Sequence, residues 1–169
     1  MTIAPSTPAP AAALSQDRFR EAAGHFASGV AVITTASGGR LYGTTASAVT
    51  SLSMEPPMML ICLNRSSSTR DALLDAGRFG ISILSVDQQK LARRFAGKGP
   101  DKFDGVAPDQ VDGIPLLPGA IAGMVCRTES TTTGGTHTVF LARVETVVTA
   151  PGEPLAYFRG GFGSFLTAR

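Results

Sequence analysis

The chain holds few of the residues that build metal centres and disulfide frameworks. It has two cysteines, two histidines and no tryptophan among 169 residues. Cys62 and Cys126 each lie within an apolar run, which is typical of buried, reduced thiols. Because there is no Cys-x-x-Cys pair, a zinc or iron site cannot be assembled at a familiar spacing. We therefore expect no bound metal.

Long apolar runs and concentrated charge are also lacking. The sequence has no stretch of about 18 apolar residues and no charged start followed by a long apolar segment, as a signal peptide has. We therefore expect a cytoplasmic protein with no membrane partner. The net charge is +2 and the basic residues are scattered, whereas nucleic-acid surfaces usually carry a basic stripe. We expect no nucleic-acid partner.

The common signatures of nucleotide binding and hydrolysis are missing as well. There is no Gly-x-Gly-x-x-Gly after a strand and no Gly-x-x-x-x-Gly-Lys-Ser/Thr loop. A Gly-x-Ser-x-Gly elbow is also absent. The sequence thus disfavours the usual dinucleotide fold, the phosphate-loop enzymes and the hydrolases.

Turn-forming residues, in contrast, are abundant. Nineteen glycines and eleven prolines indicate many tight turns, and so β structure rather than a helical bundle. Residues 1–14 are mainly Ala, Pro, Thr and Ser, and we expect them to form a disordered tail. Residues 15–169 are expected to form a single domain.

The apolar pattern predicts a mainly β protein with three short helices. Ser15 is a candidate N-cap for the first helix, and capping boxes at 68–71 and 85–88 are expected to open the others. A loop at 97–119 is long enough to suggest a functional or covering role. Strands are expected at 29–35, 40–53, 58–63, 79–84, 120–128, 136–149 and 155–158. This arrangement suggests a closed β-barrel with helices covering its ends.

Two neighbouring segments suggest a ligand site. Residues 43–53 are compatible with a strand but are mostly small and hydroxylated. Such a strand packs less favourably than one of Val and Ile, and this loss is tolerated where a ligand must lie close against the backbone. Residues 60–69 form an apolar run that ends in Asn64-Arg65 and a hydroxyl cluster opening a helix. The N-terminus of a helix favours an anion such as phosphate, although such hydroxyls also serve as simple caps. His137, after two glycines, is the best candidate for a chemical side chain, although such a histidine is often merely solvated.

Five motifs, taken in order, resemble one family. They are GVAVITT at 29–35, TTASAVTSLSMEPP at 44–57, NRSSST at 64–69, FGISIL at 79–84 and Gly-Thr-His at 135–137. Their order, and the long motif ending in Pro-Pro, resemble the short-chain flavin reductases. These are the NAD(P)H:flavin oxidoreductases that serve two-component flavin-dependent monooxygenases. The resemblance covers nearly all of residues 19–165.

The resemblance implies a fold, an activity and a set of site residues. The fold would be an FMN-binding split barrel of Greek-key type, usually a homodimer. The activity would be hydride transfer from NADH or NADPH to N5 of free FMN or FAD, with delivery of the reduced flavin to a partner monooxygenase. The implied flavin-binding residues are Thr44, Thr45, Ala46, Ser47, Ala48, Val49, Leu63, Asn64, Arg65, Ser68, Thr69, Arg70, Phe95 and Ala96. His137 would be catalytic, and the nicotinamide side would comprise His137, Gly161, Phe162, Gly163 and Ser164.

One motif departs from the family pattern. The usual turn is Gly-Asp-His, whereas this chain has Gly135-Thr136-His137. Thr can hydrogen-bond an imidazole but cannot stabilise its cation as Asp can. The orientation and protonation of His137 therefore depend on what Thr136 can do.

Three other functions stay open from the residues. One is a flavin-binding or electron-carrying protein without reductase activity. Another is an oxidase of the pyridoxamine-phosphate type on the same barrel, which would need a further basic site. The third is a structural protein in which the hydroxyl cluster only caps a helix. The residues choose neither between FMN and FAD nor between NADH and NADPH.

Overall fold

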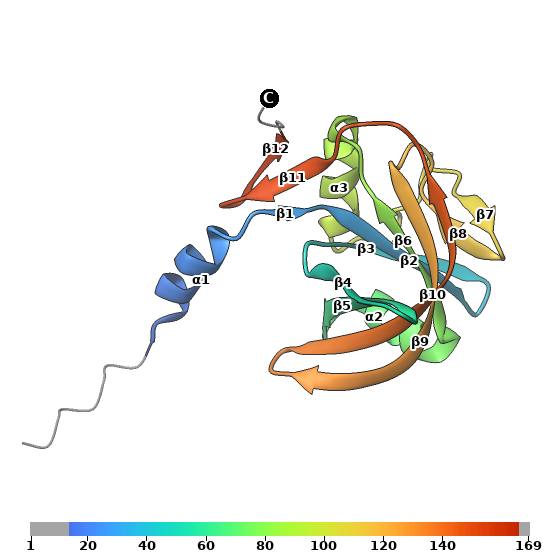
Figure 1. The fold of residues 1–169 in the computed structure, drawn as a ribbon, viewed down its shortest axis with the longest axis horizontal. Helices are drawn as coiled ribbons and strands as arrows, with labels where there is room; N and C mark the ends of the chain where they lie inside the picture. The colour runs from blue at the N-terminus through green and yellow to red at the C-terminus, as the bar shows by residue number, and fades with distance from the viewer. Residues whose placement is uncertain (1–13, 166–169) are drawn as a thin grey trace, which may run out of the picture.

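The computed structural model describes residues 14–165, and these form a mainly β structure with flanking helices, as the sequence predicts (Figure 1). The predicted tail, apart from Leu14, lies outside the described residues. The helices are α1 (Gln16–Gly24), α2 (Ser68–Ala76) and α3 (Gln89–Ala96), the last preceded by a 3₁₀ turn at Val86–Gln88. The strands are β1 (Ser28–Gly29), β2 (Ala31–Ser37), β3 (Arg40–Ala46), β4 (Val49–Met54), β5 (Pro57–Asn64), β6 (Arg78–Ile83), β7 (Asp109–Val111), β8 (Ile114–Leu116), β9 (Ala122–Gly134), β10 (His137–Thr149), β11 (Leu155–Phe158) and β12 (Gly161–Ser164).

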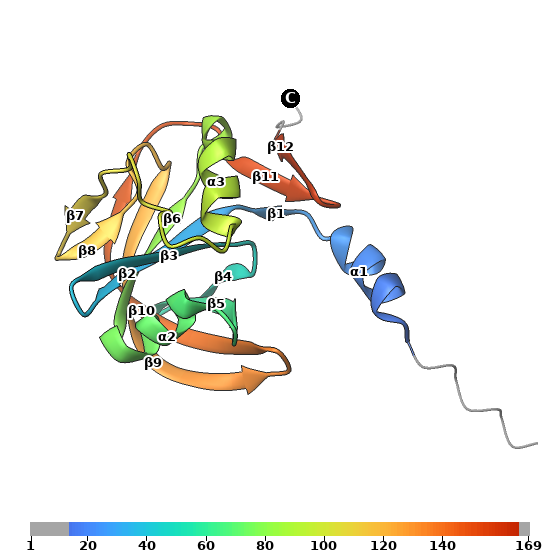
Figure 2. The same cartoon turned by 180° about the vertical axis from the view of Figure 1, so that it is seen from behind.

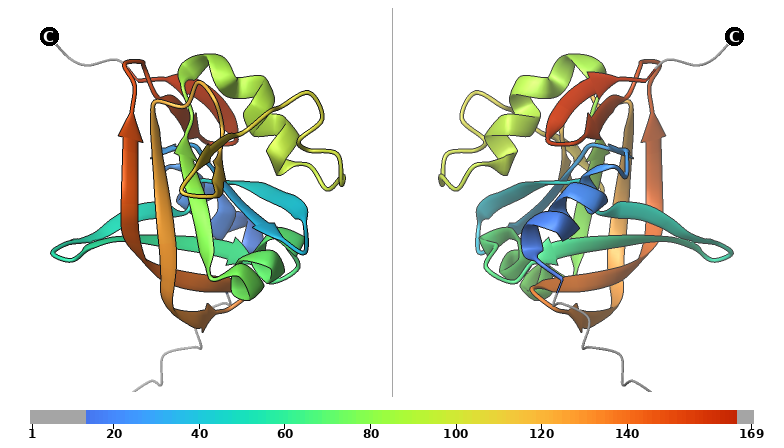
Figure 3. Two further views of the ribbon diagram at one scale, coloured as in Figure 1. Left: turned by 90° about the vertical axis from the view of Figure 1, so that its right-hand side faces the viewer. Right: turned by 90° about the vertical axis from the view of Figure 1, so that its left-hand side faces the viewer.

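Seven strands form one curled antiparallel sheet in the order β3-β2-β6-β9-β10-β5-β4. The strands at its two ends, β3 and β4, are consecutive in the chain and are linked by Ser47 and Ala48. Within residues 14–165 no ladder pairs β3 with β4, so backbone pairing does not close the barrel. The sheet curls around its core (Figure 3), and its two end strands are joined only by this link, which we call the seam.

Strand β2 is buried on both faces because each face belongs to a different core. Ile33 lies in the core inside the curled sheet, which also takes Leu73 from α2. Val32 lies in a second core, which takes Phe95 from α3. A strand covered on both faces needs a continuous apolar run rather than an alternating one, and this is what the segment 30–33 provides.

Helix α3 packs closely on β3 because Gly43 has no side chain. A Cβ atom at Gly43 would lie 2.5 Å from Cε1 of Phe95 and 3.2 Å from Cζ of Phe103. The two rings pack edge to face with their centroids 4.9 Å apart. Lys102 completes the contact, because its Nζ donates to the backbone oxygens of Gly43 and Phe95, both at 3.0 Å. The helix and the loop after it are therefore fixed against β3.

The N-terminal helix stands apart from both cores. Helix α1 extends away from the curled sheet, beside the small sheet of β1, β11 and β12 (Figures 1 and 2). The predicted helix forms and Ser15 caps it, its hydroxyl accepting from the N–H of Arg18 at 3.3 Å. None of its residues is buried. Phe19 of the helix and Phe26, which follows the helix, are 62% and 83% exposed. Phe19 and Phe26 thus belong to neither core of residues 14–165.

Four local predictions need correction. The single strand expected at 40–53 is two strands, β3 and β4, because the chain leaves the sheet at Ser47 and Ala48. The expected loop at 97–119 contains the hairpin of β7 and β8, whose strands are too short to be seen as a pattern. The N-cap of α2 is Ser67 rather than Ser68, and its side chain makes no capping hydrogen bond. Strand β9 runs to Gly134, past the expected end, because it pairs with β10 as far as the turn. The capping box at 85–88 is confirmed, although it opens the 3₁₀ turn before α3.

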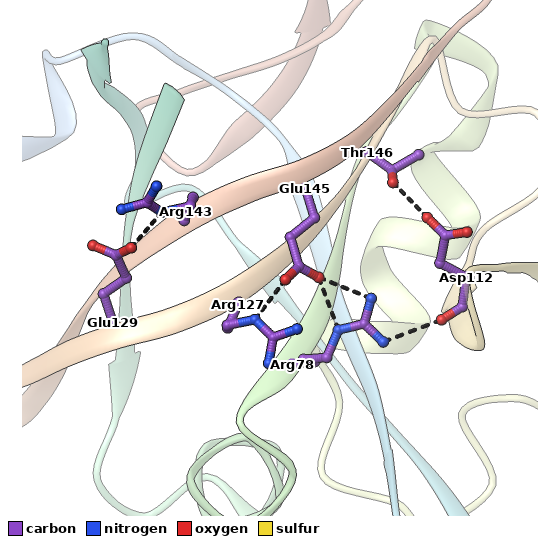
Figure 4. Close-up of polar contacts among 7 residues, drawn as sticks. All are labelled: Arg78, Asp112, Arg127, Glu129, Arg143, Glu145 and Thr146. Carbon is purple, nitrogen blue, oxygen red and sulfur yellow. Dashed lines mark hydrogen bonds and ion pairs between the residues drawn. The ribbon is translucent and has the colours of Figure 1, made fainter. Parts of the chain in front are cut away.

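An ion-pair network joins β6, β9 and β10 on the outside of the sheet (Figure 4). Glu145 lies between Arg78 and Arg127, at N–O distances of 2.8 and 2.5 Å. Arg78 also donates to the backbone oxygen of Asp112 at 3.2 Å, which ties the β7–β8 hairpin to the sheet. Desolvation acts to raise the pKa of Glu145, but the hydrogen bonds and charges of the two arginines outweigh it. The pKa of Glu145 therefore lies below its ordinary value of 4.5.

This network predicts a pH-dependent contribution to stability. Because folding lowers the pKa of Glu145, its carboxylate stabilises the fold above the unfolded-state pKa, and this contribution is lost as the pH falls through the folded-state pKa. We expect Glu145→Gln to lower the free energy of unfolding by about 1 kcal/mol or less near neutral pH. The difference should shrink in acid, as urea unfolding at several pH values would measure. Glu153→Gln, in the turn before β11, is the control; a loss for Glu145→Gln that is independent of pH would contradict the assignment.

The contact at Gly43 predicts that adding a side chain at this position lowers the free energy of unfolding. Gly43→Ala forces the Phe95 ring to move, and overpacking of this kind costs about 1–3 kcal/mol of unfolding free energy. Gly99→Ala is the matched control, because a Cβ atom there would meet nothing within 4 Å. Urea unfolding of both variants measures the difference. Equal stabilities would show that α3 and β3 do not depend on this close approach.

Candidate functional site

The end of β3, the seam and the end of β5 enclose a cavity of about 210 Å³, which we call the seam cavity. It lies beside the start of α2 and the first residue of β10. Its lining residues are Thr44, Thr45, Ala46, Ser47, Ala48, Cys62, Leu63, Asn64, Ser67 and His137. All of these except Cys62 and Ser67 are residues that the sequence resemblance places at a flavin or nicotinamide. The structure therefore brings together residues from three strands, the seam and the N-cap of α2.

Strand β3 presents backbone groups to the seam. It pairs with β2 along one edge, and Lys102 reaches the carbonyl oxygen of Gly43 on the other. Backbone groups alternate between the two edges of a strand, so Thr45 presents its N–H and C=O to the same edge as Gly43. The hydroxyl of Thr45 is turned away, because it donates to the backbone oxygen of Ala92 in α3 at 2.7 Å. Thr45 therefore offers the cavity its backbone rather than its hydroxyl.

The opposite wall is built from β5 and β10. In their ladder His137 lies opposite Asn64, and Val139 lies opposite Cys62. Directly opposite residues share a face of the sheet, so His137, Asn64 and Cys62 are on one side and the buried Leu63 is on the other. Burial raises the pKa of the Cys62 thiol, which keeps it protonated at neutral pH. Sequence reasoning missed Cys62 because its apolar surroundings indicated only a packed thiol.

The start of α2 forms one end of the seam cavity. The backbone oxygen of Ser67 accepts from the N–H groups of Arg70 and Asp71, at 3.0 and 3.3 Å. The N–H groups of Ser68 and Thr69, in the first turn, have no acceptor within the helix. The Ser67 side chain makes no capping bond and lines the cavity instead. This combination of a hydroxyl and first-turn N–H groups suits an anion.

Thr136 contacts His137 directly. Its Oγ1 lies 3.0 Å from Nδ1 of the imidazole. The backbone oxygen of Thr136 accepts from the N–H of Arg65 at 2.9 Å, so the turn is also attached to the end of β5. The substitution of Thr for the family Asp therefore keeps a hydrogen-bonding partner at Nδ1 without adding a negative charge.

Other expected flavin residues lie outside the lining of the seam cavity. Arg70 donates to Oγ1 of Thr138 at 3.0 Å and to the carboxylate of Asp71 at 2.7 Å, so its guanidinium braces α2 against β10. The ring of Phe95 is fully buried against Gly43. The remaining residues of this group are Val49, Arg65, Ser68, Thr69 and Ala96, of which Ser68 and Thr69 line a neighbouring cavity.

The expected nicotinamide residues of β12 also lie beyond the seam cavity. Gly161, Gly163 and Ser164 are exposed, whereas Phe162 packs on Tyr157 with the ring centroids 5.5 Å apart. Gly160, just before β12, lines a wide groove of about 950 Å³ together with α1 and with Thr136. Because Thr136 adjoins His137, this groove extends from the β11–β12 turn to the residue beside the seam cavity's His137.

The neighbouring cavity has a volume of about 340 Å³, and we call it the loop cavity. It is formed by the first half of β3, the start of α2 and the loop after α3. Its lining residues are Arg40, Leu41, Tyr42, Gly43, Ser68, Thr69, Lys98, Gly99, Pro100, Lys102 and Phe103. The length of the loop predicted a functional or covering role, but no sequence pattern linked it to Arg40 and Tyr42.

No helix within residues 14–165 has the length and apolar character needed to cross a membrane.

Comparison with known proteins identifies the family. Residues 23–166 match the model of the flavin reductase like domain. The reductase component of 4-nitrophenol 4-monooxygenase/4-nitrocatechol 2-monooxygenase from Rhodococcus opacus is 46% identical over 156 residues, which cover 92% of this chain and 84% of that protein. An NADH-dependent flavin reductase from Rhodococcus sp. is 35% identical over 149 residues, covering 86% and 84% of the two chains.

A solved structure shows the same fold. The NADH:FAD oxidoreductase SgcE6 of Streptomyces globisporus C-1027 has a TM-score of 0.86 and 34% identity, covering 95% of this chain and 100% of that one. Its complex with NAD and FAD fragments has a TM-score of 0.85, at 34% identity and with coverage of 89% and 93%. With a family model matching most of its length and relatives of this similarity, the chain belongs to the flavin reductase like family.

Proposed function

We propose that this chain uses NADH or NADPH to reduce free FMN or FAD and supplies the reduced flavin to a partner monooxygenase. The observation that carries the proposal is the seam cavity, where small side chains, an outward backbone edge and His137 meet in a member of the flavin reductase like family. The relatives named as reductase components and NADH-dependent reductases support it. Residues 15–169 would act as one domain in the cytoplasm, where reduced pyridine nucleotides are available.

The wall at the seam suits a flat, polar ring. Ala46, Ser47 and Ala48 have small side chains, so a ring system can lie against the backbone. When bound, the flavin supplies N5 as the acceptor for a hydride from C4 of the nicotinamide. The outward N–H of Thr45 and the hydroxyl of Ser47 are donors for the polar edge of the ring, where negative charge increases on reduction. Donors fixed in a strand need no reorganisation as that charge develops.

The start of α2 is the proposed site of the flavin phosphate. Ser67, with the first-turn N–H groups of Ser68 and Thr69, provides the donors. Asn64 is held beside them, because its Oδ1 accepts from the N–H and hydroxyl of Ser66 at 2.9 and 2.8 Å. Arg70 positions α2 through its bond to Thr138 rather than by reaching into the cavity.

His137 and residues 161–164 are the proposed nicotinamide side. Thr136 occupies Nδ1 of His137, so Nε2 is the ring nitrogen that remains for the pyridine nucleotide. The imidazole would orient the nicotinamide over the ring rather than carry the hydride. Orientation of this kind accounts for much of the rate when two reactants must be stacked.

The first experiment is a turnover assay that follows the absorbance of reduced nicotinamide. We expect oxidation that requires added flavin and saturates with it. His137→Asn should lower kcat/KM for NADH about tenfold or more without changing the Kd of the flavin. His25→Asn, just after α1, is the control.

Other outcomes of the assay would favour other functions. Flavin that binds but is not reduced would favour a binding or electron-carrying protein. Oxidation of pyridoxamine phosphate would favour the oxidase alternative. If the chain binds no flavin, the start of α2 has no role in binding a phosphate and is only the beginning of a helix.

We also propose that the chain is a homodimer in which α1 contacts the second copy. A nine-residue helix with no buried residue is marginal in water, so α1 needs a partner. The exposed rings of Phe19 and Phe26 supply an apolar surface, and the groove of about 950 Å³ between α1 and the β11–β12 turn adjoins it. The second copy is the simplest occupant, since symmetric homodimers are the commonest assemblies.

Sedimentation velocity tests the dimer. At micromolar concentration we expect the wild-type chain to sediment as a dimer and the Phe19→Ser/Phe26→Ser variant to shift toward the monomer, because the apolar contact is lost. Val147→Ser, which changes an exposed apolar residue on β10, is the control. A monomeric wild-type chain at these concentrations would refute the proposal.

A further inference from the structure

The seam cavity and the loop cavity follow one another along the outer edge of β3. Thr44 lines the first and Gly43, the preceding residue, lines the second. The same succession occurs at the start of α2, where Ser67 lines the seam cavity and Ser68 lines the loop cavity. The two cavities therefore meet at the proposed phosphate site, and a ligand that extends past this phosphate would enter the loop cavity.

The loop cavity carries positive charge. Arg40, Lys98 and Lys102 line it, and none of its lining residues is acidic. Lys102 is fixed in place, because its Nζ donates to the carbonyl oxygens of Gly43 and Phe95. Arg40 and Lys98 lie at its exposed rim. A concave surface lined by charges of one sign selects a ligand of the opposite sign.

The loop cavity also offers a flat aromatic surface. The guanidinium carbon of Arg40 lies 5.8 Å from the ring centroid of Tyr42, and both residues line the cavity. Phe103 lines it as well, held edge to face against Phe95. Purine bases stack on aromatic rings and on guanidinium planes. The cavity thus combines donors for phosphate with a surface for a base.

We propose that the loop cavity binds the adenylate half of FAD, and that the chain there distinguishes FAD from FMN. The inference rests on the proposed flavin site in the seam cavity. With the first phosphate at the start of α2, the second phosphate lies toward Lys98 and Lys102, and the adenine lies on Tyr42 beside Arg40. FMN ends at the first phosphate and gains none of these contacts, so FAD binds more tightly.

The Kd values of FMN and FAD, measured by quenching of flavin fluorescence, test this assignment. We expect the wild-type chain to bind FAD more tightly than FMN. The Arg40→Ala/Lys98→Ala variant should weaken FAD binding about tenfold, on the scale of two lost charge contacts, and should change FMN binding less than about twofold. Both side chains are exposed, so the fold should be retained. Lys90→Ala, an exposed lysine of α3 outside both cavities, should change neither value.

Adenosine monophosphate provides an independent probe. We expect it to compete with FAD and not with FMN, because it fits the loop cavity alone. Equal weakening of FMN and FAD in the variant would overturn the inference by placing the first phosphate in the loop cavity. An unchanged Kd for both flavins with a raised KM for NADH would overturn it by assigning the cavity to the pyridine nucleotide. A wild-type chain that binds neither flavin would instead refute the proposed function itself.

Discussion

The close approach of the Phe95 ring to the backbone of Gly43 determines where both cavities lie. Any larger residue at 43 would push α3 and the following loop away from β3. Two hydrogen bonds depend on this spacing, from Thr45 to α3 and from Lys102 to Gly43. The first turns the Thr45 side chain away from the seam, and the second holds the loop that forms the next cavity. The absence of a side chain at Gly43 thus allows the contacts that position one wall of each cavity.

The seam is where a curled sheet of this size has room for a ligand. The interior is filled by side chains such as Ile33, Phe79 and Phe140, which are fully buried. The outer face of β2 is covered by the second core and α3. Small residues within either core would leave voids and lower the stability, whereas at the seam they expose backbone groups. The site can therefore consist of Thr, Ala and Ser without weakening the packing of the two cores.

Much of this could be predicted from local patterns, and the rest depends on contacts between distant segments. The apolar run in β2, the small residues of 44–48 and the hydroxyls before α2 are each contiguous, so the strands and most of the seam cavity were accessible from the sequence. The loop cavity was not, because it forms only when the loop at 98–103 folds back over Arg40 and Tyr42. The burial of Phe95 and the exposure of Phe19 and Phe26 could not be predicted either, since each depends on which side chains the tertiary structure covers.

The link of Ser47 and Ala48 also sets the maximum distance between the end of β3 and the start of β4. Three peptide steps separate the last residue of β3 from the first residue of β4, and an extended chain covers at most about 3.3–3.6 Å per residue. The two end strands can therefore separate by no more than about 10–11 Å at this point. The width of the seam there is limited by covalent geometry and not by the strength of the surrounding hydrogen bonds. Fluctuations of the sheet can change the orientation of the strands that line the cavity. Only a longer link could move the linked ends of β3 and β4 further apart.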